Sequence, residues 1–219
     1  MDSQSPGGPD LTGDPQSTYD RIAAHFSKTR EYAWPEVESF LDGRAAPRAL
    51  DVGCGNGRHA ESLAERADAV IGVDLSRELL REAVDRARER GYDETASFVH
   101  GDAAALPIAT DAVGLAVYVA TVHHLPTREA RVRSLDELAR VLAPGGTALV
   151  SAWSTAHDRF DREEGFDTTV DWTLPGGETV PRYYHIYSPA EFEADIAEST
   201  LELVDLEISS GNCYATVTV

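Results

Sequence analysis

Leu50-Asp51-Val52-Gly53-Cys54-Gly55-Asn56-Gly57 is the end of an apolar strand, followed at once by glycines at every second position. A helix is expected to begin at about Arg58, directly after the last of these glycines. Glycine lets the backbone approach a ligand where a Cβ atom would collide, and the free N–H groups of a helix N-terminus attract an anion such as a carboxylate. The spacing is GxGxG preceded by an acid, which differs from the GxGxxG fingerprint of dinucleotide-binding proteins. The stretch therefore predicts a ligand-binding turn between a strand and a helix.

Strands and helices alternate around this turn. Ser76 is a suitable N-cap for a helix, and Pro144-Gly145-Gly146 is expected to end another. Strands are expected at residues 49–52, 69–74, 98–100, about 112–120 and 148–153, and helices at residues 77–90 and about 128–142. This alternation predicts an α/β fold with a doubly wound, mostly parallel sheet that is covered by helices on both faces.

The two ends of the chain depart from this pattern. Residues 1 to about 15 are rich in Pro, Gly, Ser and Asp, which predicts a disordered tail ahead of a single domain over residues 16–219. Helices are expected from Tyr19 and over residues 35–41. Residues 154–187 resemble a loop and predict a substrate-facing insertion. After a helix that begins behind Ser188, strands at about 201–208 and 213–219 are expected to form a C-terminal antiparallel hairpin, which makes the sheet seven-stranded.

The composition of the chain indicates which classes of protein and which kinds of site can be expected. The chain carries 38 acidic and 19 basic residues, a formal net charge of −19, and Lys28 is its single lysine. Such an acidic surface is expected of a halophilic protein, because concentrated salt screens the repulsion between like charges. Cys54 and Cys213 are far apart and follow no metal-ligand spacing, so no metal site is expected. The chain shows no apolar run of membrane-spanning length and no signal-peptide pattern, which predicts a soluble, cytoplasmic protein.

Acidic residues also follow the next two strands of the expected sheet. Asp74 ends the strand at 69–74, and Asp102 follows the strand at 98–100. Ligands of doubly wound sheets bind at the carboxyl ends of the strands, where these residues meet the glycine turn. Asp74 is placed to accept hydrogen bonds from a ribose diol, and Asp102 to accept one from the exocyclic amine of adenine.

With these three elements, the sequence from about residue 17 onward resembles the class I S-adenosylmethionine-dependent methyltransferases, whose fold is Rossmann-like. The resemblance implies S-adenosylmethionine as cofactor and favours it over NAD. The residues implied to bind it are Tyr19, Asp51, Gly53, Gly55, Gly57, Asp74, Leu75, Asp102 and Ala103.

Two classes of methyl transfer find no support in the sequence. The polar-Pro-Pro-aromatic loop common in enzymes that methylate exocyclic amines is absent, because residues 120–125 read Ala-Thr-Val-His-His-Leu. Methylation at pyrimidine C5 needs a nucleophilic cysteine, and neither Cys54 in the turn nor Cys213 in the last strand is well placed. The chemistry that remains is transfer to an acceptor that needs neither group.

Three further segments, residues 25–35, 122–131 and 182–187, resemble the tRNA wobble-uridine methyltransferases that esterify 5-carboxymethyluridine. A carboxylic acid is already ionised at neutral pH, so the enzyme's main task is orientation, and arginine can grip a carboxylate with two hydrogen bonds. The site residues implied by this resemblance are Arg30, His123 or His124, Trp153, Arg182 and Tyr184.

The same resemblance implies tRNA as substrate and a small zinc-binding activator subunit that forms a heterodimer with the chain. Several alternatives stay open. One of the arginines could hold an RNA phosphate instead of the carboxylate, and each candidate residue could have a purely structural role. The main alternative function is methylation of a small molecule, for example a quinone precursor, because the cofactor half of the fold is shared among substrates.

Overall fold

The computed structural model describes residues 14–219, and the described chain begins just before helix α1 (Pro15–Thr29). The predicted tail, apart from its last two residues, therefore lies outside the described residues. Asp14 caps α1 by accepting hydrogen bonds from the backbone N–H groups of Gln16 and Ser17. Within residues 14–219, no helix is long and apolar enough to cross a membrane.

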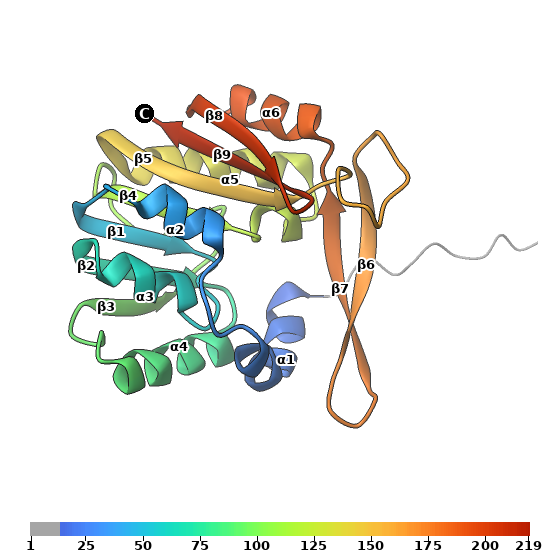
Figure 1. The fold of residues 1–219 in the computed structure, drawn as a ribbon, viewed down its shortest axis with the longest axis horizontal. Helices are drawn as coiled ribbons and strands as arrows, with labels where there is room; N and C mark the ends of the chain where they lie inside the picture. The colour runs from blue at the N-terminus through green and yellow to red at the C-terminus, as the bar shows by residue number, and fades with distance from the viewer. Residues whose placement is uncertain (1–13) are drawn as a thin grey trace, which may run out of the picture.

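A seven-stranded sheet forms the centre of the molecule (Figure 1), in the order β3-β2-β1-β4-β5-β9-β8. The first five strands in this order pair in parallel, whereas β9 pairs antiparallel with both β5 and β8. The strands are β1 (Ala46–Val52), β2 (Ala67–Asp74), β3 (Ala96–His100), β4 (Val113–Val119), β5 (Leu142–Trp153), β8 (Glu202–Ser209) and β9 (Asn212–Thr218). The predicted doubly wound, mostly parallel sheet with a C-terminal hairpin is confirmed.

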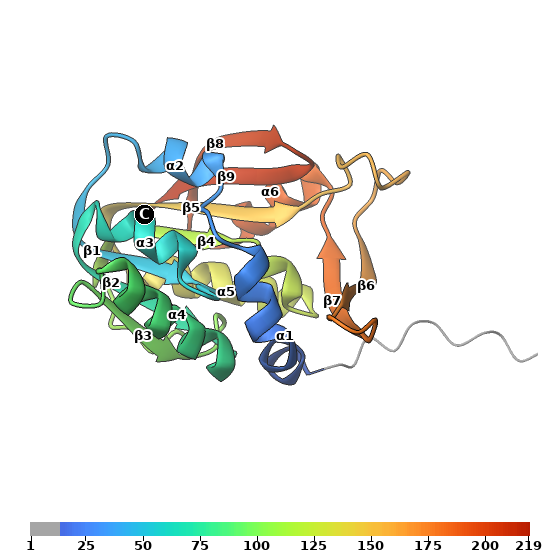
Figure 2. The ribbon, with the colours of Figure 1, turned by 60° about the horizontal axis from the view of Figure 1, so that its bottom comes forward.

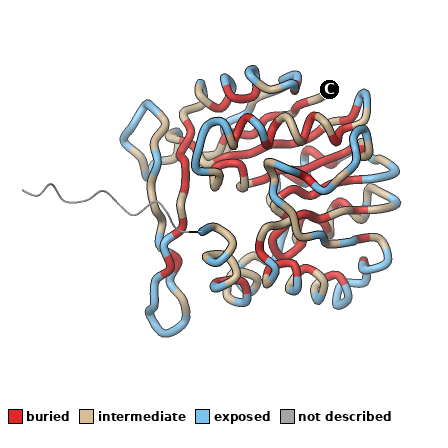
Figure 3. Tube along the Cα trace, turned by 180° about the vertical axis from the view of Figure 1, so that it is seen from behind, coloured by how far each residue is buried: buried red, intermediate tan, exposed pale blue. Residues whose placement is uncertain are grey.

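Helices cover both faces of this sheet, as Figures 1 and 2 show. Helices α2 (Pro35–Leu41), α3 (Arg58–Ala64) and α4 (Arg77–Arg90) bury residues such as Leu63 in one apolar core. Helices α5 (Arg128–Val141) and α6 (Pro189–Glu198) bury residues such as Leu138 and Phe192 in the other. The buried residues run along the strands between these layers (Figure 3).

The start of β5 and the segment after β4 differ most from the predictions. Strand β5 begins at Leu142, six residues before the predicted start, because Leu142 already pairs with Val113 ahead of the Pro144-Gly145-Gly146 turn. The register between β4 and β5 then shifts before Leu115 pairs with Thr147. A short 3-10 helix, η1 (Val122–His124), follows β4 and carries both candidate histidines.

The prediction of a loop over residues 154–187 was wrong for most of that segment. Strands β6 (Phe166–Thr173) and β7 (Thr179–Ile186) form a separate antiparallel hairpin. Its strands contain β-branched and aromatic residues, which favour extended structure. The turn between them contains Gly176 and Gly177, both with positive φ angles, behind a proline. These turn residues between two β-prone runs were the signal for a hairpin.

The β6–β7 hairpin stands at the carboxyl ends of β4 and β5, beside α1 (Figure 1). Ile22 of α1 packs with Trp172 and Val180 of the hairpin in a small apolar cluster of their own. Arg21 and Glu178 form an ion pair beside it. Helix α1 and the hairpin together therefore enclose the edge of the sheet at which the sequence predicts a ligand.

Candidate functional site

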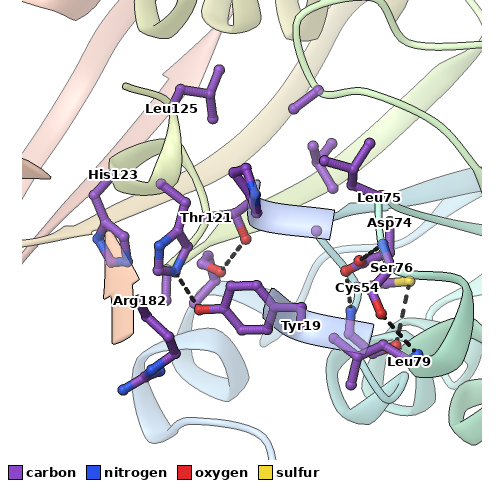
Figure 4. A pocket seen from close by; sticks show the side chains of 18 of the residues that line it. Tyr19, Cys54, Asp74, Leu75, Ser76, Leu79, Thr121, His123, Leu125 and Arg182 are labelled. Atoms are coloured by element: carbon purple, nitrogen blue, oxygen red, sulfur yellow. Dashed lines mark hydrogen bonds between the residues drawn. The ribbon is translucent and has the colours of Figure 1, made fainter. Parts of the chain in front are cut away.

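A cavity of about 730 Å³ lies at this edge of the sheet. Residues of the glycine turn, the ends of β2, β4 and β5, helix α1, η1 and strand β7 line it. Figure 4 shows Asp74 and Leu75 at one end of the cavity and His123 and Arg182 at the other, with Tyr19 between them. All the predicted cofactor and substrate residues except Asp51 and Gly57 thus line one continuous space.

The glycine turn has the backbone conformation that its sequence requires. Gly53, Gly55 and Gly57 all have positive φ angles, between 52° and 77°. A Cβ atom at Gly53 would lie 2.1 Å from Thr121 Oγ1, so no larger residue fits there without a shift. At Gly55, which lines the cavity, a Cβ atom would have its nearest neighbour 3.6 Å away, on the ring of Phe26. The turn therefore forms a cradle in which the backbone itself faces the ligand.

Asp74 connects this turn to the end of β2. One carboxylate oxygen accepts a hydrogen bond from the N–H of Gly55 and the other accepts one from the N–H of Ser76, both at 2.8 Å. Burial raises the pKa of Asp74 above its ordinary value, although these backbone donors oppose the shift. Leu75 and Ala103 line the cavity beside it, as does Asp102, an exposed residue whose Oδ1 accepts from the N–H of Ala104 at 2.9 Å.

Asp51 and Gly57 lie outside the lining of the cavity, although the sequence placed them in the cofactor site. The Asp51 side chain is buried and its carboxylate has no hydrogen-bond partner among the described residues. Burial and the negative charge of Asp74 raise its pKa to about 7. Gly57 caps α3 and faces Ala83, Tyr92 and Phe98, each within 3.2 Å of the position that a Cβ atom would take there. Asp51 and Gly57 therefore support the glycine turn from the side that faces away from the cavity.

Helix α1 is tied directly to the cofactor end of the cavity. Asp20 Oδ1 accepts hydrogen bonds from the Ser76 hydroxyl at 2.6 Å and from the N–H of Glu78 at 3.1 Å, at the start of α4. Asn56, within the glycine turn, donates to the carbonyl oxygen of Arg30 at 2.9 Å, just past the end of α1. These contacts link distant parts of the chain, and no local sequence pattern indicated them.

The two histidines of η1 are neutral and have opposite tautomers. His124 Nδ1 lies 2.8 Å from the carbonyl oxygen of Tyr183, so this nitrogen carries the proton and Nε2 accepts from the Tyr19 hydroxyl, also at 2.8 Å. His123 Nδ1 accepts from the N–H of Trp153 at 2.9 Å, so its proton lies on Nε2. Burial lowers the pKa of His124 to about 4 and that of His123 well below its ordinary value.

These tautomers give the two histidines different capacities. Both nitrogens of His124 are bound by protein atoms, so that ring fixes the position of Tyr19. No side chain among residues 14–219 accepts a hydrogen bond from His123 Nε2–H, and the residue lines the cavity. His123 is therefore the histidine that can donate a hydrogen bond to a ligand.

Arg182 is a buried cation without an acidic neighbour. The residue is 9% exposed, it forms no ion pair with any described residue, and its Nε has no hydrogen-bond partner there. Its guanidinium lies 4.9 Å from the ring centre of Trp172 and 5.2 Å from that of Tyr184. Arg30, also in the lining, lies 5.4 Å from the same Trp172 ring. Because buried charges are normally paired, this arrangement indicates a site for an anion.

Two further arginines of the lining were not identified from the sequence. Arg58 begins α3 and stacks 5.2 Å from the Trp34 ring centre, and burial together with the charge of Arg30 lowers its pKa to about 10. Arg159 lies 5.7 Å from the ring centre of Trp153. Neither forms an ion pair within residues 14–219. The sequence feature that could have identified Arg58 is its position, because it is a basic residue directly after the glycine turn in a very acidic chain.

Apart from Arg58, which lies beside the glycine turn, charge is segregated along the cavity. Asp74 and Asp102, its two acidic lining residues within the described chain, lie where β2 and β3 end. The four arginines of the lining are all free of ion pairs with described residues, whereas arginines elsewhere, such as Arg86 and Arg140, pair with glutamates. The end with Asp74 and Asp102, here called the acidic end, suits hydroxyl and amine groups. The end with Arg30, Arg159 and Arg182, here called the arginine end, suits anions.

Residues 49–146 match the family described as "Methyltransferase domain". The chain is 39% identical over 140 residues to tRNA (carboxymethyluridine(34)-5-O)-methyltransferase ALKBH8 of Mus musculus, covering 62% of this chain and 19% of that protein. It is 35% identical over 170 residues to the Saccharomyces cerevisiae protein named tRNA (carboxymethyluridine(34)-5-O)-methyltransferase, covering 75% of this chain and 58% of the relative. The chain thus spans only part of these two relatives.

A relative of similar length is a putative methyltransferase of Encephalitozoon cuniculi, which is 33% identical over 77% of this chain and 78% of its own. Among solved structures, the CcbJ methyltransferase from Streptomyces caelestis has the same fold, with a TM-score of 0.77, 20% identity, and coverage of 94% of this chain and 99% of that one. A methyltransferase in complex with the Haloferax volcanii Trm112 activator matches with a TM-score of 0.68 at 16% identity, over 94% of this chain and 97% of that one. From its relatives, its sheet order and its glycine turn, the chain belongs to the class I S-adenosylmethionine-dependent methyltransferases.

Proposed function

We propose that the protein esterifies the carboxymethyl group of 5-carboxymethyluridine at the wobble position of tRNA, with S-adenosylmethionine as methyl donor. The observation that carries this proposal is Arg182, a buried guanidinium that faces the cavity with no acidic partner among the described residues. A carboxylate is the acceptor that such a group binds and orients. The names of the mouse and yeast relatives support the same substrate.

The residues at the acidic end fit the cofactor. The glycine cradle accepts a ligand against the backbone, and Asp74 and Asp102 offer carboxylate oxygens to ribose hydroxyls and an adenine amine. Tyr19, Gly53, Gly55, Leu75 and Ala103 complete this subsite, and Asp51 and Gly57 support its turn. When bound, the cofactor supplies an electrophilic methyl group on a sulfonium, whose carbon–sulfur bond breaks as the ester oxygen–carbon bond forms.

The residues at the arginine end bind and orient the acceptor. Arg30 and Arg182 grip the carboxylate, which is already ionised at neutral pH because its ordinary pKa is about 4. No proton has to be removed, which agrees with two histidines whose pKa values are lowered by burial. His123 donates from Nε2 to the substrate, and His124 holds Tyr19. Trp153 and Tyr184 provide aromatic faces for the uracil ring.

The arginines that do not grip the carboxylate suit the other anions of the reactants. Arg159 is exposed beside Trp153 at the cavity and is available to an RNA phosphate. Arg58, beside the glycine turn, is available to the carboxylate of the cofactor's amino-acid part. The acidic remainder of the chain repels RNA in dilute buffer, so we propose that the enzyme works in concentrated salt, where this repulsion is screened.

We further propose that the chain acts in the cytoplasm as a heterodimer with a small zinc-binding activator. The resemblance to the tRNA enzymes and the activator complex of the solved relative support this assembly. The test is co-expression with a candidate activator, followed by gel filtration. A 1:1 complex with raised activity is expected, and a fully active single chain would contradict the assembly.

The proposed reaction is tested with purified protein, S-adenosylmethionine and tRNA that carries 5-carboxymethyluridine. Formation of the methyl ester, detected by mass spectrometry of the nucleosides, is expected from the wild type. The matched control substrate is the same tRNA with unmodified uridine, which lacks the carboxylate and should remain unmethylated. Methylation of a small molecule but not of the modified tRNA would favour the quinone-precursor alternative.

A further inference from the structure

Trp172 of β6 is fixed between the hairpin and α1. The residue is 9% exposed, and its Nε1–H donates to His25 Nδ1 at 3.0 Å. Its cross-strand partner Val180 and Ile22 of α1 pack against it. Trp172 is not part of the cavity lining, so it can reach a ligand only through another side chain.

The side chains through which it can act are the two arginines of the proposed carboxylate grip. The guanidinium of Arg182 on β7 lies 4.9 Å from the Trp172 ring centre, and that of Arg30, past the end of α1, lies 5.4 Å from it. Both distances are within the range of about 6 Å over which a cation interacts favourably with an aromatic ring. One indole therefore contacts two cations from segments that are far apart in the sequence.

An aromatic ring holds an arginine differently from an acid. Arg131, the other strongly buried arginine of the described chain, also lies over a ring, that of Tyr187, but Glu191 at 3.4 Å and Asp195 at 3.6 Å neutralise its charge. Contact with the face of a ring fixes the plane of the guanidinium but leaves its charge and its N–H donors available. Two arginines held in this way present a converging positive field that no described carboxylate cancels.

We propose that Trp172 is a positioning residue that holds Arg30 and Arg182 in the orientation that grips the substrate carboxylate. This inference rests on the proposed function for the identity of the carboxylate. The placement of the arginines by Trp172, however, is a property of the free protein and can be measured without any substrate.

The first experiment observes the arginines directly, by 15N–1H NMR of their Nε–H groups in the full chain. Replacing Trp172 with Leu removes the ring, and Val180→Ala is the matched control because it weakens the same apolar cluster but keeps the ring. Ring currents from Trp172 should shift the Arg182 Nε–H resonance, and this shift should be lost in Trp172→Leu and kept in Val180→Ala. An unchanged Arg182 resonance in Trp172→Leu would overturn the inference.

The second experiment measures kcat/KM for esterification of the modified tRNA. Trp172→Leu should lower kcat/KM about tenfold or more, as expected for loss of a desolvated cation–aromatic contact. The affinity for S-adenosylmethionine, measured by calorimetry, should stay within about twofold of the wild type. Trp172→Phe keeps an aromatic face and should recover most of the activity, although it cannot donate to His25.

A double-mutant cycle with Arg182→Gln separates positioning from general loosening of the fold. If Trp172 acts through Arg182, the double variant should lose less than the product of the two single losses. Fully multiplicative losses would contradict the inference. Failure of the wild type to esterify the tRNA would instead contradict the proposed function, and the NMR comparison would still decide the role of Trp172.

Discussion

Replacing Arg182 with methionine is expected to remove activity while leaving the stability of the enzyme almost unchanged. A hydrogen bond to a charged group contributes about 1.5 to 3 kcal/mol, so loss of one such bond to the carboxylate should lower kcat/KM by roughly 10- to 150-fold. The cation of Arg182 is 9% exposed and has no acidic partner among the described residues. Its removal relieves a desolvation cost that offsets the two aromatic contacts that are lost.

The matched control is Arg131→Met, because Arg131 is also buried but contacts Glu191 at 3.4 Å and Asp195 at 3.6 Å. Removing one member of a buried ion-pair network costs about 3 kcal/mol or more. For a chain of this length that corresponds to a decrease in Tm of roughly 6 to 12 °C, whereas Arg182→Met should change Tm by less than about 4 °C.

Thermal unfolding followed by circular dichroism measures Tm for the two variants, and the tRNA esterification assay measures kcat/KM. Arg131→Met should retain substantial kcat/KM at temperatures where it is folded. The reasoning would be refuted if Arg182→Met lost as much stability as Arg131→Met, or if it kept the activity of the wild type.

Three further predictions concern the cofactor end, pH and salt. Asp74→Asn should weaken S-adenosylmethionine binding at least tenfold in calorimetry, and unchanged affinity would contradict the cofactor assignment. Because Asp74 also accepts hydrogen bonds from the N–H groups of Gly55 and Ser76, a modest decrease in Tm should accompany the loss of affinity. Burial lowers the pKa of His124 to about 4, below its value near 6.5 in the unfolded chain. The unfolded state therefore binds the extra proton, and stability should fall as pH decreases from about 6.5 to 4. His124→Gln should flatten this part of a plot of Tm against pH, and a curve parallel to that of the wild type would exclude the mechanism. With 38 acidic against 19 basic residues, Tm should rise between about 0.1 and 2 M KCl, and a Tm that falls over this range would contradict the halophilic interpretation.

The elements that sequence predicted best are those fixed by local chemistry. Helix α4 begins at Arg77 behind the Ser76 cap and ends before Gly91, which has a positive φ angle, so its limits are encoded by neighbouring residues. The glycine turn is similar, because its spacing alone requires the backbone to turn where β1 ends. The β6–β7 hairpin was missed because its length and polar residues resembled a loop, although the turn with Gly176 and Gly177 was a usable signal.

The candidate site shows the same division between local and tertiary information. Tyr19, Asp74, Arg30 and Arg182 all line the cavity, whereas Asp51 lies behind it. What sequence could not provide is the set of contacts between distant segments. The role of Trp172 depends on two arginines, one just past the end of α1 and one on β7, that meet only in the folded chain. The tautomers of the histidines depend on backbone atoms of other elements.

The central claim is that the cavity binds and methylates a carboxylate on tRNA. Mass spectrometry of tRNA nucleosides from a strain that lacks the gene tests it most directly. We predict accumulation of unesterified 5-carboxymethyluridine or a close derivative at the wobble position, reversed by the wild-type gene and not by Arg182→Met. A wobble-nucleoside profile identical to that of the parent strain would contradict the claim.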